Sequence, residues 1–135
     1  MSYLLDTNVC IAVVNGRPTQ VRHRLGEMAR NQAALYVSAL SLFEIEFGLR
    51  KIDREAETRE KYEQLFGKLS KVPFDVDDAT AAGGIRAELE ITGRPIGAYD
   101  YLIAGQALRR NWTLITANER EFLRVEGLKT ENWAR

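Results

Sequence analysis

The chain has 135 residues, with 19 Lys and Arg against 19 Asp and Glu, so its formal net charge is zero. Overall charge therefore gives no support for nucleic-acid binding, and any such partner must meet a local basic patch. No apolar run approaches the roughly 20 residues of a membrane span, no secretory signal is visible, and the single Cys10 cannot form an internal disulfide, which fits the cytoplasm.

The first half of the sequence predicts two short buried strands and three helices. The apolar runs are of strand length, and Asn-Gly-Arg-Pro at residues 15–18 predicts a turn between them. Two consecutive helices predict a helical hairpin that stands off the sheet. In chain order, the expected elements are a strand over residues 3–5, a helix from Thr19 to about Arg30, a strand over 34–37, and helices over 38–51 and 53–71.

The second half predicts three more strands. Pro73 favours an edge position or a strand start for the first of them. Strands that alternate with helices indicate a mainly parallel sheet covered on both faces, and no internal linker divides residues 1–135. The expected elements are a strand over 72–76, a helix from Asp77 or Asp78 to about Ile91, a helix over 98–110, a strand over 113–116, a loop and short helix over 117–123, and a strand over 128–133.

Acidic residues follow the predicted strands at one edge of this sheet. Carboxyl ends of parallel strands and the starts of the following helices share an edge, so these side chains should converge. Repulsion between them would favour protonation, and a divalent cation such as Mg²⁺ or Mn²⁺ would relieve it. The sequence therefore predicts a metal site there. The acids are Asp6, Glu44, Asp100, Glu119 and Glu121.

Several of these residues also allow an interpretation without metal. Asp6 could cap the helix that follows it, and Asp100 could stabilise a helix N-terminus through the macrodipole. The run from Ser41 to Glu44 fits a capping box. Thr7 is expected to support a ligand rather than to act as a nucleophile, because no base is paired with it.

Five stretches of the chain resemble the motifs of a known family and occur in the same order. They are LLDTN (4–8), SALSLFEIEFG (38–48), IGAYDYLIA (96–104), LITANEREF (114–122) and ENW (131–133). Together they resemble the PIN domain, the nuclease fold of VapC-type toxins. The resemblance implies a single PIN domain over residues 1–135, with a three-layer α/β/α fold, a central, mainly parallel sheet and a protruding helical hairpin.

The resemblance also implies which residues form the site. By this resemblance the metal-binding acids are Asp6, Glu44 and Asp100. The fourth position departs from the family pattern, because Asn118 stands where many members carry Asp. Glu121, or else Glu119, is expected to supply the missing carboxylate as a catalytic residue, while Asn118 could still bind or orient a water. Arg94 is the expected contact for an RNA phosphate.

The activity that the resemblance implies is metal-dependent hydrolysis of RNA, of tRNA or another structured RNA, by a homodimeric toxin of a type II toxin–antitoxin pair. Mg²⁺ or Mn²⁺ would activate a water and stabilise the leaving oxygen. The partner antitoxin is expected to insert a C-terminal segment beside the helical hairpin. The apolar residues there, which could equally be core, are Leu42, Phe43, Phe47, Tyr62 and Phe66.

Two other classes of function fit part of the pattern. A phosphotransfer domain could use Asp6 at the end of the first strand, but Asn8 stands where haloacid dehalogenases carry a second Asp, and no Lys follows the strand over 113–116, as response regulators require. A catalytically silent PIN-like binding module agrees with the altered fourth position, whereas the three intact acids argue against it.

Overall fold

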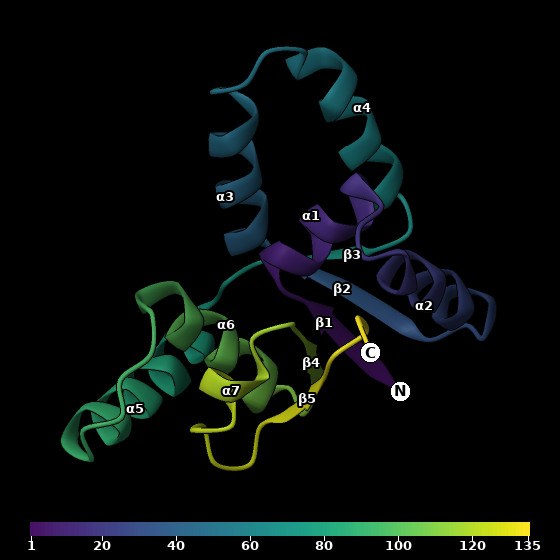
Figure 1. Cartoon of the computed structure of the whole chain (residues 1–135). Coiled ribbons are helices and arrows are strands. Elements are labelled where there is room, and N and C mark those ends of the chain that lie inside the picture. The colour runs from purple at the N-terminus through teal and green to yellow at the C-terminus, as the bar shows by residue number, and fades with distance from the viewer.

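A parallel sheet of five short strands forms the centre of the molecule, in the order β3-β2-β1-β4-β5 (Figure 1). All four pairs of neighbouring strands are parallel, so every strand ends at the same edge. This confirms the predicted parallel sheet. The strands of the computed structural model, which describes residues 1–135, are β1 (Ser2–Leu5), β2 (Ala34–Ser38), β3 (Ser70–Val72), β4 (Thr113–Ile115) and β5 (Lys129–Glu131).

Seven helices surround the sheet. Figure 1 shows α1 to α4 above and beside it, with α5, α6 and α7 gathered at its other side. None of them combines the length and the apolar character that a membrane span requires. They are α1 (Thr7–Asn15), α2 (Thr19–Arg30), α3 (Ala39–Leu49), α4 (Glu55–Phe66), α5 (Val76–Ile91), α6 (Ala98–Arg109) and α7 (Glu119–Phe122).

The alternation of side chains along β1 divides the apolar core into two parts. Tyr3 and Leu5 pack into a cluster with residues of α1 to α4, whereas Leu4 packs with residues of α5, α6 and α7. Because successive strand residues point to opposite faces, each cluster lies on its own side of the sheet. The predicted three-layer α/β/α arrangement is therefore confirmed.

The predicted helical hairpin is also confirmed, since α3 and α4 rise away from the sheet in Figure 1. An ion pair joins them: Arg59 donates from Nη1 and Nη2 to the two carboxylate oxygens of Glu46, at 2.7 and 2.9 Å. Arg50 donates to the same carboxylate at 2.7 Å. Hydrogen bonds from Arg59 and Arg50 lower the pKa of Glu46 to about 2.

Several predicted boundaries are wrong, most clearly around β3: the helix expected over residues 53–71 is α4, which ends at Phe66, and Ser70–Val72 form a strand. The strand expected over residues 72–76 is β3, which ends at Val72, because Pro73 has no N–H with which to continue the ladder. The cap of the following helix is Asp75 rather than Asp77 or Asp78. The Asp75 carboxylate accepts from the Asp78 N–H at 2.9 Å, and the Asp78 carboxylate accepts from the Asp75 N–H at 3.0 Å, which completes a capping box.

A buried ion-pair network joins α5 to the end of α6. Asp78 is fully buried, and it accepts from Arg109 Nε at 2.9 Å and from Arg110 Nη2 at 3.0 Å. Burial opposes ionisation of Asp78, but hydrogen bonds from Arg110, the Asp75 N–H and Arg109 outweigh it, so the pKa lies below its ordinary value. These ion pairs hold the start of α5 against the end of α6, at the opposite end of α6 from Asp100.

Candidate active site

Asp6 lies at the edge of the sheet where β1 ends. Its side chain is buried, and its Oδ1 accepts a hydrogen bond from the Val9 N–H at 2.9 Å, so it is the N-cap of α1. Burial raises the pKa of Asp6 and the nearby charge of Glu44 adds to this, whereas the Thr116 hydroxyl and the Val9 N–H favour the ionised form. Asp6 is therefore a cap and, at the same time, a carboxylate beside a second acid.

Glu44 reaches the same place from α3. The N-cap of α3 is Ser38, so the alternative interpretation of Ser41 to Glu44 as a capping box is wrong. Instead the Thr7 hydroxyl donates to Glu44 Oε1 at 2.6 Å, and the buried Ser41 hydroxyl lies 2.9 Å from the Thr7 oxygen. Thr7 has one proton, which Glu44 accepts, so Ser41 must donate to Thr7. Two hydroxyl groups thus fix one oxygen of Glu44.

Asp100 approaches from the first turn of α6, which begins after Gly97. Its pKa is raised to about 6, first by burial, then by a hydrogen bond with Glu121, and further by the charges of Glu121, Asp6 and Glu44. Asp6 and Glu44 line the same cavity as Asp100. The structure thus brings Asp6, Glu44, Asp100 and Glu121 to one edge.

The residues around the fourth position separate into two groups. Asn118 Nδ2 donates to Glu121 Oε2 at 3.1 Å, on the side where Glu121 meets Asp100. Glu119 accepts from Arg135 Nη2 at 2.6 Å and is thereby committed to an ion pair. This geometry favours Glu121 over Glu119 as the additional carboxylate, with Asn118 orienting it.

A small cavity of about 90 Å³ opens between the acids. Thr7, Asn8 and Tyr99 line it together with the three acids Asp6, Glu44 and Asp100. In this conformation no three His, Cys, Asp or Glu side chains are arranged so that together they could hold a metal ion. Mg²⁺ usually keeps several waters and binds one or two carboxylates rather than an all-protein cage, so this donor set fits such an ion.

The remaining sequence expectations concern the surroundings of the site. Arg94 is exposed in the loop between α5 and α6 and does not line the acidic cavity, so its contact with RNA stays a prediction. Sequence reasoning missed Ser41 as a support for Glu44. The available signal was its position three residues earlier, which puts both side chains on one face of a helix.

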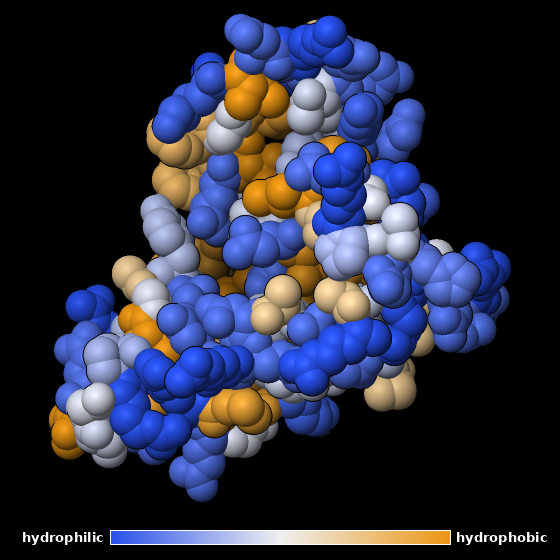
Figure 2. Space-filling view, viewed as in Figure 1, coloured by the Kyte–Doolittle hydropathy of each residue, from blue (hydrophilic) through white to orange (hydrophobic).

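The apolar residues of the hairpin divide between core and surface. Tyr62 is buried, and Leu42 and Phe66 are partly buried against the core. Phe43 and Phe47 are 59% and 62% exposed, and the Phe43 ring lies 6.2 Å from that of Tyr99. Figure 2 shows apolar side chains gathered over the hairpin, among hydrophilic ones.

Comparisons with known proteins extend over nearly the whole chain. The PIN domain matches residues 3–128. The tRNA(fMet)-specific endonuclease VapC of Shigella flexneri is 37% identical over 134 residues, 99% of each protein. Ribonuclease VapC2 of Rickettsia felis is 34% identical over 133 residues, 98% of each.

Solved structures agree with these sequences. One is the structure of VapBC2 from Rickettsia felis bound to a DNA fragment from the promoter. A chain of that structure is 33% identical to this chain, with a TM-score of 0.91, and the match covers 98% of this chain and 99% of the Rickettsia chain. DNA-bound VapBC from Salmonella typhimurium gives a TM-score of 0.88 and 32% identity over 98% of each chain. The similarity therefore concerns the complete fold rather than one motif.

Proposed function

The chain belongs to the PIN-domain family, and from this premise we propose that it is a VapC-type endoribonuclease toxin that hydrolyses RNA with the help of Mg²⁺ or Mn²⁺. The observation that carries the proposal is the convergence of Asp6, Glu44, Asp100 and Glu121 at the carboxyl edge of the sheet. The relatives' names, a tRNA-specific endonuclease and a ribonuclease, support RNA as the substrate.

Asp6, Glu44 and Asp100 would hold the metal ion. When bound, the ion would lower the pKa of a water and stabilise the charge on the leaving oxygen. Thr7 keeps Glu44 Oε1 in a hydrogen bond, while Oε2 accepts none from another side chain and would be available to the ion. Glu121, oriented by Asn118, adds a fourth acid beside Asp100, where it would position the attacking water.

The partners follow from the family and from the exposed surface. Solved relatives are VapBC complexes, which supports an antitoxin for this chain too. We expect the antitoxin to lie beside the hairpin and the protein to form a homodimer, with the exposed Phe43 and Phe47 as available apolar surface. The cytoplasm is the expected location, since it keeps the single Cys10 reduced.

The two rival functions fare differently. A phosphorylated Asp6 is disfavoured because the side chain is buried and one of its oxygens already caps α1. The geometry of Asp6 does not argue against a catalytically silent binding module. A measurement of RNA cleavage distinguishes that module from the nuclease.

The test is cleavage of tRNA and of an unstructured RNA of equal length by the purified protein, with Mg²⁺, with Mn²⁺ and with EDTA. We expect cleavage with either metal and none with EDTA, with tRNA as the better substrate. Cleavage that persists in EDTA would contradict metal dependence. Metal binding without cleavage of any RNA would favour the silent module.

A further inference from the structure

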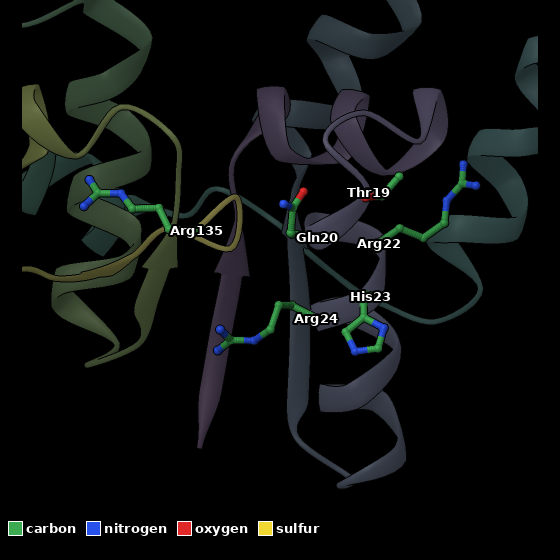
Figure 3. A pocket seen from close by; sticks show the side chains of 6 residues that line it. All are labelled: Thr19, Gln20, Arg22, His23, Arg24 and Arg135. Atoms are coloured by element: carbon green, nitrogen blue, oxygen red, sulfur yellow. The ribbon is translucent and has the colours of Figure 1, made fainter.

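A second cavity, of about 560 Å³, lies apart from the acids and has no hydrophobic lining (Figure 3). In Figure 3 the start of α2 provides most of the wall, and the chain end provides Arg135 on the other side. Such a polar wall suits a hydrated anion better than an apolar ligand. We call it the α2 cavity, and its lining residues are Thr19, Gln20, Arg22, His23, Arg24 and Arg135.

Two arginines of the α2 cavity have donors that no protein group uses. Arg22 donates from Nε and Nη2 to the Val13 carbonyl at 3.1 and 2.7 Å, which holds its side chain against α1, while its Nη1 makes no hydrogen bond. Arg24 donates from Nη2 to Glu131 at 3.3 Å, whereas its Nε is buried without any partner. The Arg24 Nε is enclosed by protein and out of reach of a ligand in the cavity, whereas Nη1 of Arg24, like Nη1 of Arg22, makes no hydrogen bond and can donate to an oxygen ligand.

Arg135 links the α2 cavity to the acidic edge. Its side chain is 75% exposed, and it donates to Glu119 at the start of α7. The same short helix carries Glu121, which meets Asp100. Arg24 pairs with Glu131 at the carboxyl end of β5, so the cavity and the acids lie toward the same edge of the sheet.

The charge of this region differs from that of the whole chain. Residues 17–30 contain four arginines and one glutamate, although the complete sequence has a net charge of zero. Arginine presents several donors in a planar fork that matches the oxygens of a phosphate. The region therefore supplies the local basic patch that a neutral nuclease needs to hold a polyanion.

We propose that the α2 cavity binds backbone phosphates of the RNA beside the segment that is cleaved, with Arg24 and Arg135 as the principal contacts. This rests on the proposed function, because it assigns a substrate-binding surface to the same nuclease. Contacts to phosphates do not read sequence, but they fix the register of the strand. The α2 cavity thus positions the RNA while the acids act on one diester.

The test compares the double variant Arg24→Gln/Arg135→Gln with the matched double variant Arg54→Gln/Arg86→Gln, which removes two exposed arginines outside residues 17–30. Affinity for tRNA is measured in EDTA by fluorescence anisotropy at several salt concentrations. When the logarithm of the association constant is plotted against the logarithm of the salt concentration, each lost phosphate contact makes the negative slope shallower by about 1. We expect a slope smaller by about 2 and binding weaker by about ten-fold or more at low salt for the first variant only.

Hydrolysis of bis(p-nitrophenyl) phosphate, a small diester without a flanking RNA strand, is the second measurement. Arg24→Gln/Arg135→Gln should hydrolyse it as the wild type does, while KM for tRNA rises and kcat is unchanged. Equal affinity and slope in both double variants would overturn the proposal. A loss of bis(p-nitrophenyl) phosphate hydrolysis in Arg24→Gln/Arg135→Gln would also overturn it. RNA binding that depends on these arginines in a protein unable to cleave RNA would instead reject the proposed function alone.

Discussion

The Thr7 hydroxyl donates a hydrogen bond of 2.6 Å to Oε1 of Glu44, so α1 and α3 meet at the acidic edge through one side-chain contact. Thr7 directly follows Asp6, and the contact therefore fixes the spacing between two of the acids that are proposed to bind metal. The buried Ser41 hydroxyl donates to the Thr7 oxygen, so the Thr7 proton stays directed at Glu44. The orientation of Glu44 is consequently set before any ligand arrives.

Removal of this hydroxyl should weaken metal binding. Thr7→Val keeps the shape of the side chain and loses the donor, and groups that orient metal ligands are typically worth about 10–100-fold in metal affinity. We expect a loss of that size in Mn²⁺ affinity by calorimetry, and recovery in Thr7→Ser. Thr80→Val on the exposed face of α5 is the control. Wild-type affinity in Thr7→Val would show that the contact is not needed.

The ion pairs of Asp78 should contribute to stability. Asp78→Asn removes the charge that faces Arg109 and Arg110, whose side chains are 32% and 21% exposed and can partly rehydrate. We therefore expect a loss of about 2 kcal/mol in the free energy of unfolding, below the range for fully buried pairs. Urea denaturation measures it, with the exposed Asp77→Asn as control. Equal stability of the two variants would argue against the network.

The same residue predicts a dependence of stability on pH. The folded pKa of Asp78 lies below the ordinary value of 3.8. Its contribution is therefore fully present above that value and is lost as the pH falls through the folded pKa. The difference in unfolding free energy between wild type and Asp78→Asn should be constant from pH 7 to 5 and shrink below pH 3.8. A difference that grows on acidification would contradict this assignment.

Close packing of α5 on α6 should make Gly105 sensitive to substitution. A Cβ at Gly105 would lie 2.6 Å from the backbone N of Ala82, so the helices must separate. We expect Gly105→Ala to lower the free energy of unfolding by roughly 1–3 kcal/mol. Gly84→Ala on α5 meets no atom within 4 Å and should instead stabilise by about 0.5–1 kcal/mol. Thermal denaturation distinguishes the two directions.

Much of this architecture is predictable from local pattern. Apolar runs such as residues 3–5 end at a carboxylate, and parallel strands must end at one edge, so the approach of Asp6, Glu44 and Asp100 follows from the order of the elements. The end of β3 at Val72 and the start of α3 after Ser38 depend instead on strand pairing and on which serine reaches a free N–H. Neither is visible in local propensity.

The long-range contacts were beyond sequence reasoning. Arg109 lies 31 residues from Asp78, and Arg135 lies 16 residues from Glu119. Nothing in the intervening residues indicates which charges meet, because the packing of helices on the sheet decides it. For the same reason the α2 cavity could not be predicted, although four arginines in a short stretch were visible.

The most direct test of the central claim is the rate of RNA cleavage with Mn²⁺ by Asp100→Asn, beside the exposed control Asp77→Asn. If the acids at the carboxyl edge are the metal site, Asp100→Asn should fold normally and lose at least about 100-fold in rate, while Asp77→Asn keeps it. A folded Asp100→Asn that cleaves RNA at the wild-type rate would contradict this account of the active site.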